Sequence, residues 1–196
     1  MVIKNRLSNH GSLKTFSLTT ILALALLAVS VSASLSFAAS AKSLDADVDD
    51  AIERFNKEVT GSKLFLEKAK GILVFPQVIK AGFGIGGEYG EGALRVKGKT
   101  VDYYNTMAAS IGFQLGVQAK TVILVFTKQE ALEKFRNSDG WKVGVDGSVA
   151  LITLGMGDSL DTINVEDPIV GFVFGQKGLM YNLTLEGSKF KKLNKK

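Results

Sequence analysis

The sequence predicts an α+β fold: two N-terminal helices, then a mostly antiparallel, sandwich-like or barrel-like sheet of about seven to eight strands with one inserted helix. Two observations predict it. Apolar residues recur at spacings of three and four near residue 50, and a capping-box pattern near residue 127 indicates a further helix. From residue 72 onward, most other apolar residues alternate with polar ones or form short runs between turn residues. No linker interrupts this pattern, so we expect a single domain over residues 42–196.

The first 41 residues have the pattern of an export signal. A basic start precedes an apolar run at residues 21–31, and small residues offer cleavage after Ala38 or Ala41. The run is shorter than the roughly 20 residues that span a membrane. We expect cleavage and export to the periplasm or out of the cell, with an uncleaved anchor as the alternative. The basic residues of this segment are Lys4, Arg6 and Lys14.

Composition excludes several classes of function. The chain has no cysteine, and its one histidine, His10, lies in the predicted signal, so disulfides, zinc clusters and histidine-based catalytic triads are excluded from the mature protein. Removing the signal takes away three of the 24 basic residues and none of the 19 acidic ones, which lowers the net charge from +5 to +2. This balance argues against nucleic acid as a partner. We expect no enzyme activity, no cofactor and no metal site.

Two helices are predicted at the start of the mature chain. Residues 43–59 combine an apolar stripe with an acidic polar face. An interfacial helix that seeks anionic lipid carries basic residues, so we interpret the stripe as core packing, with lipid contact as the alternative. A second helix is predicted over 62–71, capped by Ser62 and ended by Gly71. The stripe consists of Leu44, Val48, Ile52, Phe55 and Val59.

Strands are predicted for most of the remaining chain. A buried strand at 72–76 is expected to end at Pro76, and a hairpin at 92–104 is expected to turn at Gly98. Further strands are predicted at 107–118 and 121–126, across 141–155, and in a hairpin at 169–187 that turns at 176–178. The segment 121–126 is apolar on both faces, which indicates a central strand.

The inserted helix is predicted over 127–135, where Thr127 and Glu130 form the pattern of a capping box. A tight turn or bulge is predicted at 146–147, and a polar loop at 157–168. The basic tail at 188–196 is expected to fray.

The stretch GFGIGGEYGEG at 82–92 contains the pattern G-x-G-x-x-G, which can mark a dinucleotide-binding loop. Such a loop leads into a helix whose N-terminus holds the pyrophosphate. Here the glycines continue into strand periodicity, which argues against a nucleotide. Alternate glycines instead leave strand faces bare, which favours close backbone approach where the sheet closes or, alternatively, a slot for an acyl chain or flat ligand. These glycines are Gly82, Gly84 and Gly86 in one strand and Gly112 and Gly116 in another.

Four segments that occur in order are informative together: AKGILVFPQVIKAGFGIGGEYGEGAL (69–94), SIGFQLGVQAKTVILVF (110–126), VGVDGSVA (143–150) and GLMYNLTLEGS (178–188). Together they closely resemble the SYLF domain. The resemblance covers about residues 43–190. It implies a lipid-binding domain, called actin-binding in older descriptions; eukaryotic members bind phosphoinositide membranes and some bundle actin. The predicted signal and the lack of an SH3 or zinc-finger module resemble the bacterial exported branch.

Basic residues near the glycine stretch are the candidate ligands for lipid head groups, because each cation near an anionic surface contributes about 1 kcal/mol to binding. The candidates are Lys63, Lys68, Lys70, Lys80, Arg95, Lys97 and Lys99, with the tail lysines and Phe190 as further contacts. We expect a non-enzymatic, peripheral protein of the cell envelope that binds anionic phospholipid, phosphoinositide-type head groups being implied by the resemblance. The alternative is an interaction protein whose glycine-rich sheet packs on a protein partner, such as actin, or on itself.

Overall fold

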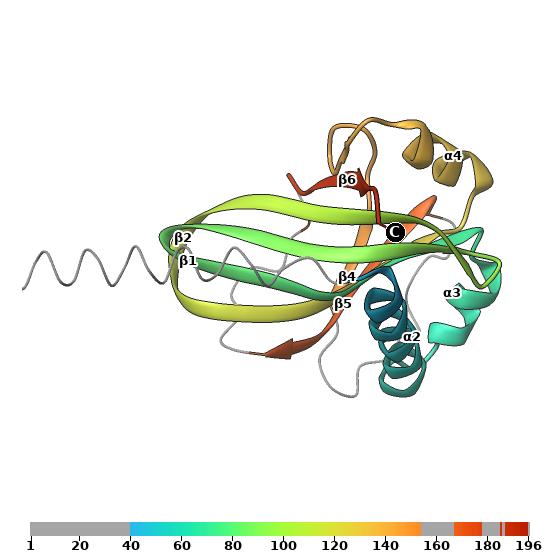
Figure 1. The fold of residues 1–196 in the computed structure, drawn as a ribbon, viewed down its shortest axis with the longest axis horizontal. Helices are drawn as coiled ribbons and strands as arrows, with labels where there is room; N and C mark the ends of the chain where they lie inside the picture. Colours follow the sequence, from blue (N-terminus) through green and yellow to red (C-terminus); the bar gives the residue numbers. More distant parts are fainter. Residues whose placement is uncertain (1–39, 154–166, 178–184, 186, 196) are drawn as a thin grey trace, which may run out of the picture. The chain divides into compact units, whose positions relative to one another are not determined.

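The structure is a computed structural model that describes residues 40–153, 167–177, 185 and 187–195, with the backbone alone at 83–85 and 110–116. Within these residues it contains three helices and six strands (Figure 1). The helices are α2 (Ala41–Glu58), α3 (Ser62–Lys68) and α4 (Gln129–Asn137). The strands are β1 (Gly71–Val96), β2 (Lys99–Phe126), β3 (Trp141–Lys142), β4 (Ala150–Thr153), β5 (Ile169–Lys177) and β6 (Lys189–Leu193). The α+β fold is confirmed, with two helices before the strands and α4 inserted after β2.

The described strands belong to one sheet with β2 at its centre. The order is β3-β6-β2-β5-β4, and β1 pairs with β2 outside this path. Every pair is antiparallel except β4 with β5, so the mostly antiparallel sheet is confirmed. The predicted signal lies outside the described residues, save for its last two positions. Among the helices that the structure describes, none is long and apolar enough to cross a membrane.

β1 and β2 are much longer than the predicted strands. Pro76 does not end a strand but lies within the 26-residue β1, at a shift of register between Phe75 and Val78. Proline is tolerated there because an irregular position needs no ladder hydrogen bond. The strands predicted at 107–118 and 121–126 are likewise one continuous strand, the 28-residue β2.

The long hairpin of β1 and β2 bends back on itself (Figure 1). A Cβ at Gly90 would lie 2.8 Å from the carbonyl oxygen of Gln77, and one at Gly92 would overlap the carbonyl oxygen of Val74. The two halves of β1 therefore approach each other backbone to backbone, and only glycine leaves the space for this. Close approach is thus found in the glycine stretch, at its last two glycines.

The turn of this hairpin is at the predicted position. Val96 pairs with Lys99, and the two residues between them, Lys97 and Gly98, have φ values of 51° and 76°. Positive φ at both central positions is the geometry of a type I′ turn, which matches the twist of the flanking strands. Glycine adopts this conformation without steric cost, whereas Lys97 holds it at some cost.

Both predicted helix caps are wrong. Gly61, with φ of 87°, precedes α3, and Ser62 is buried without capping it; α3 also ends three residues before its predicted end. Lys128 precedes α4, and its side chain does not cap the N-terminus of that helix. The hydroxyl of Thr127 instead donates to the carbonyl oxygen of Asp167 at 2.6 Å, so the predicted capping box is not formed. A hydrogen bond to a distant segment has replaced the local one.

The predicted fraying of the basic tail is also wrong. β6 pairs with residues 103–107 of β2 and with β3. Phe190 is 1% exposed and stacks near Phe75 and Trp141, so it is not available for insertion into a membrane. Alternation explains this outcome, since one apolar residue between lysines is enough to anchor a short strand over a core.

The segments after α4 are described in part. Asp146 lies in the predicted turn, where its carboxylate accepts from the backbone amide of Lys142 at 2.6 Å. β5 supplies the first half of the hairpin predicted at 169–187. Gln176 and Lys177, two of the three residues of the turn predicted at 176–178, still belong to β5, and residues 178–184 lie outside the described residues. So does nearly all of the polar loop predicted at 157–168.

Two hydrophobic cores form on the two faces of the central strands. α2 and α3 cover one face, where Phe55 and Phe65 contact Phe172 at ring distances of 4.8 and 5.0 Å. α4 and β6 contribute to the other, where Phe135 lies 6.2 Å from Phe190. The predicted apolar stripe of α2 is buried in the first core, with Ile52 partly buried at its margin, so the core-packing interpretation is confirmed.

Candidate functional site

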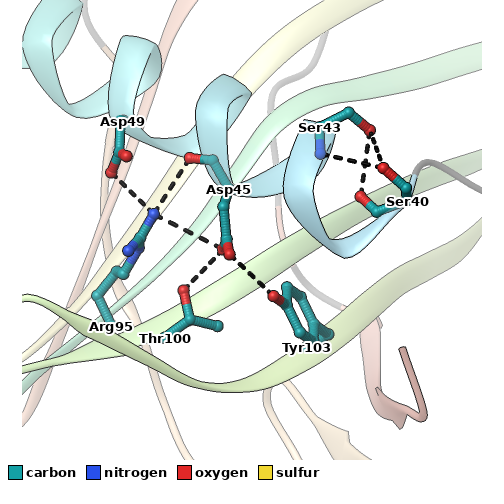
Figure 2. A network of polar contacts seen from close by, with 7 residues as sticks. All are labelled: Ser40, Ser43, Asp45, Asp49, Arg95, Thr100 and Tyr103. Carbon is teal, nitrogen blue, oxygen red and sulfur yellow. Dashed lines mark hydrogen bonds and ion pairs between the residues drawn. The ribbon is translucent and has the colours of Figure 1, made fainter. Parts of the chain in front are cut away.

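A polar network fixes α2 to the β1–β2 hairpin (Figure 2). The carboxylate of Asp45 accepts from the hydroxyls of Thr100 and Tyr103 at 2.7 and 3.0 Å. Arg95 donates to the backbone oxygen of Asp45 at 3.1 Å and pairs with Asp49 at 2.8 Å. Burial, together with the Asp45 carboxylate, raises the pKa of Tyr103, so its phenol stays a donor at neutral pH. Arg95, a predicted head-group ligand, is therefore committed to α2.

The start of α2 belongs to the same region (Figure 2). Ser40 is the N-cap, and its hydroxyl oxygen accepts from the backbone amide of Ser43 at 3.1 Å. The hydroxyl of Ser43 donates in return to the backbone oxygen of Ser40, also at 3.1 Å. These bonds fix the first turn, two residues before Asp45, and so help to hold the carboxylate in place.

A second group of charges is buried where the long hairpin bends. Glu88 pairs with Lys80 at 3.4 Å through one carboxylate oxygen and with Lys120 at 2.7 Å through the other. The side chains of all three are under 10% exposed. Lys80, predicted to face lipid, therefore neutralises an internal carboxylate. The pairing follows from the fold, because the bend brings residue 80 of β1 against residue 88 of the same strand.

The C-terminal residues close a third polar cluster. Lys195 binds Glu91 at 2.7 Å, with both side chains about 10% exposed, and the hydroxyl of Tyr89 donates to the same carboxylate at 2.8 Å. Burial, together with the Glu91 carboxylate, raises the pKa of Tyr89 to about 12. The phenol thus remains protonated at physiological pH. Lys195 anchors the end of the chain to β1, a contact that its position in a lysine-rich tail does not indicate.

Five of the seven predicted lysine and arginine ligands remain on the surface. Lys63 and Lys68 are exposed on α3, Lys70 just after it, and Lys97 and Lys99 at the β1–β2 turn. None of the five forms an ion pair with any residue that the structure describes. We call them the outer lysines. Leu64, 46% exposed on α3, lies among them in the sequence.

An apolar pocket of about 290 Å³ lies between α2, α3 and the β1–β2 turn. It is lined by the apolar side chains of Ile52, Leu66 and Ile72 and by the charged residues Asp49, Arg95 and Lys97. Figure 1 shows the two helices side by side near this end of the hairpin. The pocket and the outer lysines therefore share one region, since α3 and the turn contribute to both.

The predicted glycine faces come together at the bend. Gly82 pairs with Gly116, and Gly86 pairs with Ser110. Gly84 lies where the register shifts between Phe83 and Ile85, opposite the segment that holds Gly112. An acyl-chain slot along these glycines would involve residues 83–85 and 110–116, for which the structure describes the backbone alone. The slot therefore stays a prediction. The apolar pocket above lies elsewhere, and sequence reasoning did not find it because its wall comes from three separate segments.

The described residues contain no group of three or more histidine, cysteine, aspartate or glutamate side chains placed to hold a metal ion.

Comparison with known proteins identifies a family for the second half of the chain. Residues 107–196 match the family model Ysc84, described as Las17-binding protein actin regulator. No curated protein matches the chain. The matched range covers the second part of β2 and all later described elements. This match confirms the SYLF prediction for residues 107–196 and supports a role in binding lipid or protein.

Proposed function

We propose that the protein is a non-enzymatic, peripheral membrane-binding protein that attaches to anionic phospholipid through the outer lysines. The observation that carries the proposal is that these five cations, which form no ion pair in the described structure, lie on or beside α3 and at the β1–β2 turn, and both segments also line one apolar pocket. At about 1 kcal/mol each, five lysines supply on the order of 5 kcal/mol, which corresponds to a dissociation constant between 1 mM and 1 μM. Electrostatics alone thus gives weak, salt-sensitive attachment.

The pocket offers the further contact that such attachment needs. An apolar chain gains about 0.8 kcal/mol for each buried methylene. A few methylenes in the space between Ile52, Leu66 and Ile72 would raise the affinity by one to two orders of magnitude. Phosphoinositide-type head groups fit the lysine surface by the resemblance to the family, and an exported protein of the cell envelope would meet other anionic phospholipids. The envelope location is part of the proposal and rests on the pattern of residues 1–41.

Co-sedimentation with liposomes tests this function. Vesicles with and without anionic phospholipid are compared at low and physiological salt. We expect binding to the anionic vesicles alone, weakened by salt, and at least tenfold weaker binding for the triple variant Lys63→Glu, Lys70→Glu, Lys97→Glu. The matched control, Lys128→Glu, Lys134→Glu, Lys142→Glu, makes the same change of charge at exposed lysines around α4 and should keep most of the binding. Equal losses in both variants would show that net charge, not this surface, determines attachment.

A protein partner is the second candidate function, favoured by the family description, which names a Las17-binding actin regulator. Val145, 72% exposed in the turn after β3, is an apolar side chain within the matched range that such a partner would cover. Absence of binding to every liposome, with retention of a specific protein partner after Lys63→Glu, would favour this candidate.

A further inference from the structure

A second pocket, of about 410 Å³, lies away from the apolar one and has charged walls. It is formed by α2 together with β1, β2 and β5. Asp47, Asp50 and Arg54 line it from the helix, and Lys177 lines it from the end of β5. The three α2 residues follow spacings of three and four, which places them on one side of the helix.

Regular strand pairing is interrupted on every strand that reaches this pocket. The β1–β2 register shifts between Phe75 and Val78, and the β2–β5 register shifts between Ala119 and Thr121. Gly175 of β5 has φ of 63°. Bulges bend strands and redirect side chains, and they are frequent beside binding sites. Here the two register shifts and the positive φ of Gly175 all occur beside the same pocket.

Arg54 is held in position at this pocket. Its Nη2 donates to the hydroxyl of Thr121 at 3.2 Å, and that hydroxyl donates to the carbonyl oxygen of Pro76 at 2.9 Å. The guanidinium also lies 5.7 Å from the ring centre of Phe174. A Cβ on Gly175 would come within 3.1 Å of Nη1, so the glycine leaves room for the arginine. These contacts orient a guanidinium whose other donors have no hydrogen-bond partner among the described residues and can therefore serve a ligand.

The charges around the pocket are not paired with one another. Arg54 and Lys177 form no ion pair within the described part of the chain, and neither do Asp47 and Asp50. Lys120 also lines the pocket, but its ammonium group binds Glu88. Two cations and two carboxylates thus face one cavity, which complements a small molecule that carries both signs of charge.

We propose that this pocket binds a zwitterionic phosphate ester, with the phosphate on Arg54 and Lys177 and an ammonium group on Asp47 and Asp50. The guanidinium fork suits phosphate oxygens, and a carboxylate pair suits an ammonium ion. The same chemistry occurs in the head group of an ethanolamine phospholipid and in free phosphoethanolamine. This site shares no residue with the outer lysines. The proposal can therefore be tested independently of the membrane-binding function proposed above.

Isothermal titration of the full chain with phosphoethanolamine, ethyl phosphate and ethanolamine tests the site. We expect phosphoethanolamine to bind at least tenfold more tightly than either single-charge compound. Arg54→Gln and Lys177→Gln should each weaken it at least tenfold. Lys57→Gln, which removes an exposed cation from the same helix, is the matched control and should change the affinity less than twofold.

Asp50→Asn separates a zwitterion site from a simple anion site. The variant should lower the affinity for phosphoethanolamine severalfold, because it removes a partner of the ammonium group. Its affinity for ethyl phosphate, which has no ammonium group, should be unchanged or higher. Equal effects on both compounds, or no binding of phosphoethanolamine to the parent protein, would overturn the proposal. Lys177 is exposed, so its variant keeps the test valid if Arg54→Gln does not fold.

Vesicles distinguish the two sources of the ligand. If vesicles containing ethanolamine phospholipid compete with free phosphoethanolamine and choline-only vesicles do not, the ligand is a lipid head group. If neither competes while the free compound binds, the ligand is a soluble metabolite of this chemistry. Both outcomes support the site.

Discussion

The cations of this protein differ according to whether the fold provides a carboxylate for them. Lys80, Lys120 and Lys195 are each paired with a largely buried carboxylate, and Arg95 pairs with the exposed carboxylate of Asp49; the N–O distances lie between 2.7 and 3.4 Å. The outer lysines have no such partner in the described structure. The first set holds together segments far apart in sequence, since Arg95 meets Asp49 across 46 residues and Lys195 meets Glu91 across 104.

A basic residue near a glycine-rich stretch can therefore be either an internal, paired cation or an exposed one. The inner cations serve stability, because a buried charge must be neutralised where it lies. The outer lysines are free to attract anions, because removing them costs the fold little. A variant should therefore affect either stability or binding, and the following predictions test that division.

Glu88→Gln should have the largest effect on stability. It leaves the ammonium groups of Lys80 and Lys120 buried without a carboxylate, and breaking a buried ion pair costs about 3–5 kcal/mol. Urea denaturation measures the loss. Glu133→Gln, at an exposed glutamate of α4, is the control and should change the free energy of unfolding by less than about 0.5 kcal/mol. A loss below 1 kcal/mol at Glu88 would mean that the inner lysines do not depend on this carboxylate.

Gly92→Ala tests the close approach that brings the inner charges together. The new Cβ would overlap the carbonyl oxygen of Val74, and backbone cannot yield as a side chain can. We expect a loss of about 3 kcal/mol in urea denaturation. Gly87→Ala is the matched control, because its Cβ would lie 3.6 Å from the nearest atom, an ordinary contact. Similar effects for the two substitutions would refute the argument from space.

Asp45→Ala removes the acceptor that joins α2 to the hairpin. Arg95, Thr100 and Tyr103 lose a shared partner, and hydrogen bonds to charged groups contribute about 1.5–3 kcal/mol. We expect the free energy of unfolding, measured by urea denaturation, to fall by about 2 kcal/mol. Asp47→Ala, on the same helix but without an ion pair in the described structure, should be nearly neutral. A smaller loss for Asp45 than for Asp47 would contradict the network.

In a chain that keeps Ser40, either uncleaved or cleaved after Ala38, Ser40→Ala should weaken the start of α2 by about 1 kcal/mol, because it removes the acceptor for the amide of Ser43. Thermal unfolding of the variant measures this, and Ser40→Asp should restore the stability, since aspartate is an equally good N-cap. Failure of the rescue would show that the cap is not what Ser40 contributes.

The charge-reversed outer lysines should show the smallest effect on stability. Lys63→Glu, Lys70→Glu and Lys97→Glu together should change the free energy of unfolding by no more than about 1 kcal/mol, because each side chain is exposed and unpaired. Urea denaturation, run beside the liposome assay, gives the comparison. If this variant unfolds under native conditions, the outer lysines contribute to stability as the inner cations do, and the division is wrong.

Sequence reasoning identified what depends on local pattern. The apolar stripe of α2 follows from a 3.6-residue period, and the turn at Gly98 follows from the need for positive φ. The fold class followed from the two periods together. The predictions were wrong where a long-range contact determines the local structure. Pro76 continues a strand because a bulge accommodates it. Thr127 donates a hydrogen bond to Asp167 and does not cap its own helix.

The candidate site was predictable only in composition. The seven cations were chosen by residue type and position, but whether each is inside or outside depends on partners that no local pattern indicates. Lys80 is internal because the hairpin bend places Glu88 against it, and Lys63 is external because α3 turns it outward. Both pockets were missed for the same reason, since each is assembled from separate segments, the charged pocket from residues as far apart as Asp47 and Lys177 and the apolar pocket from residues as far apart as Asp49 and Gly98.

The bend in β1 also has a consequence for how the protein opens. Because the two halves of β1 pack backbone to backbone at Gly90 and Gly92, we expect detachment of one half to remove the packing of the other. Amide protons at Val74 and at Ala93, which lie in different halves, should therefore exchange with solvent at similar rates, through a single cooperative opening.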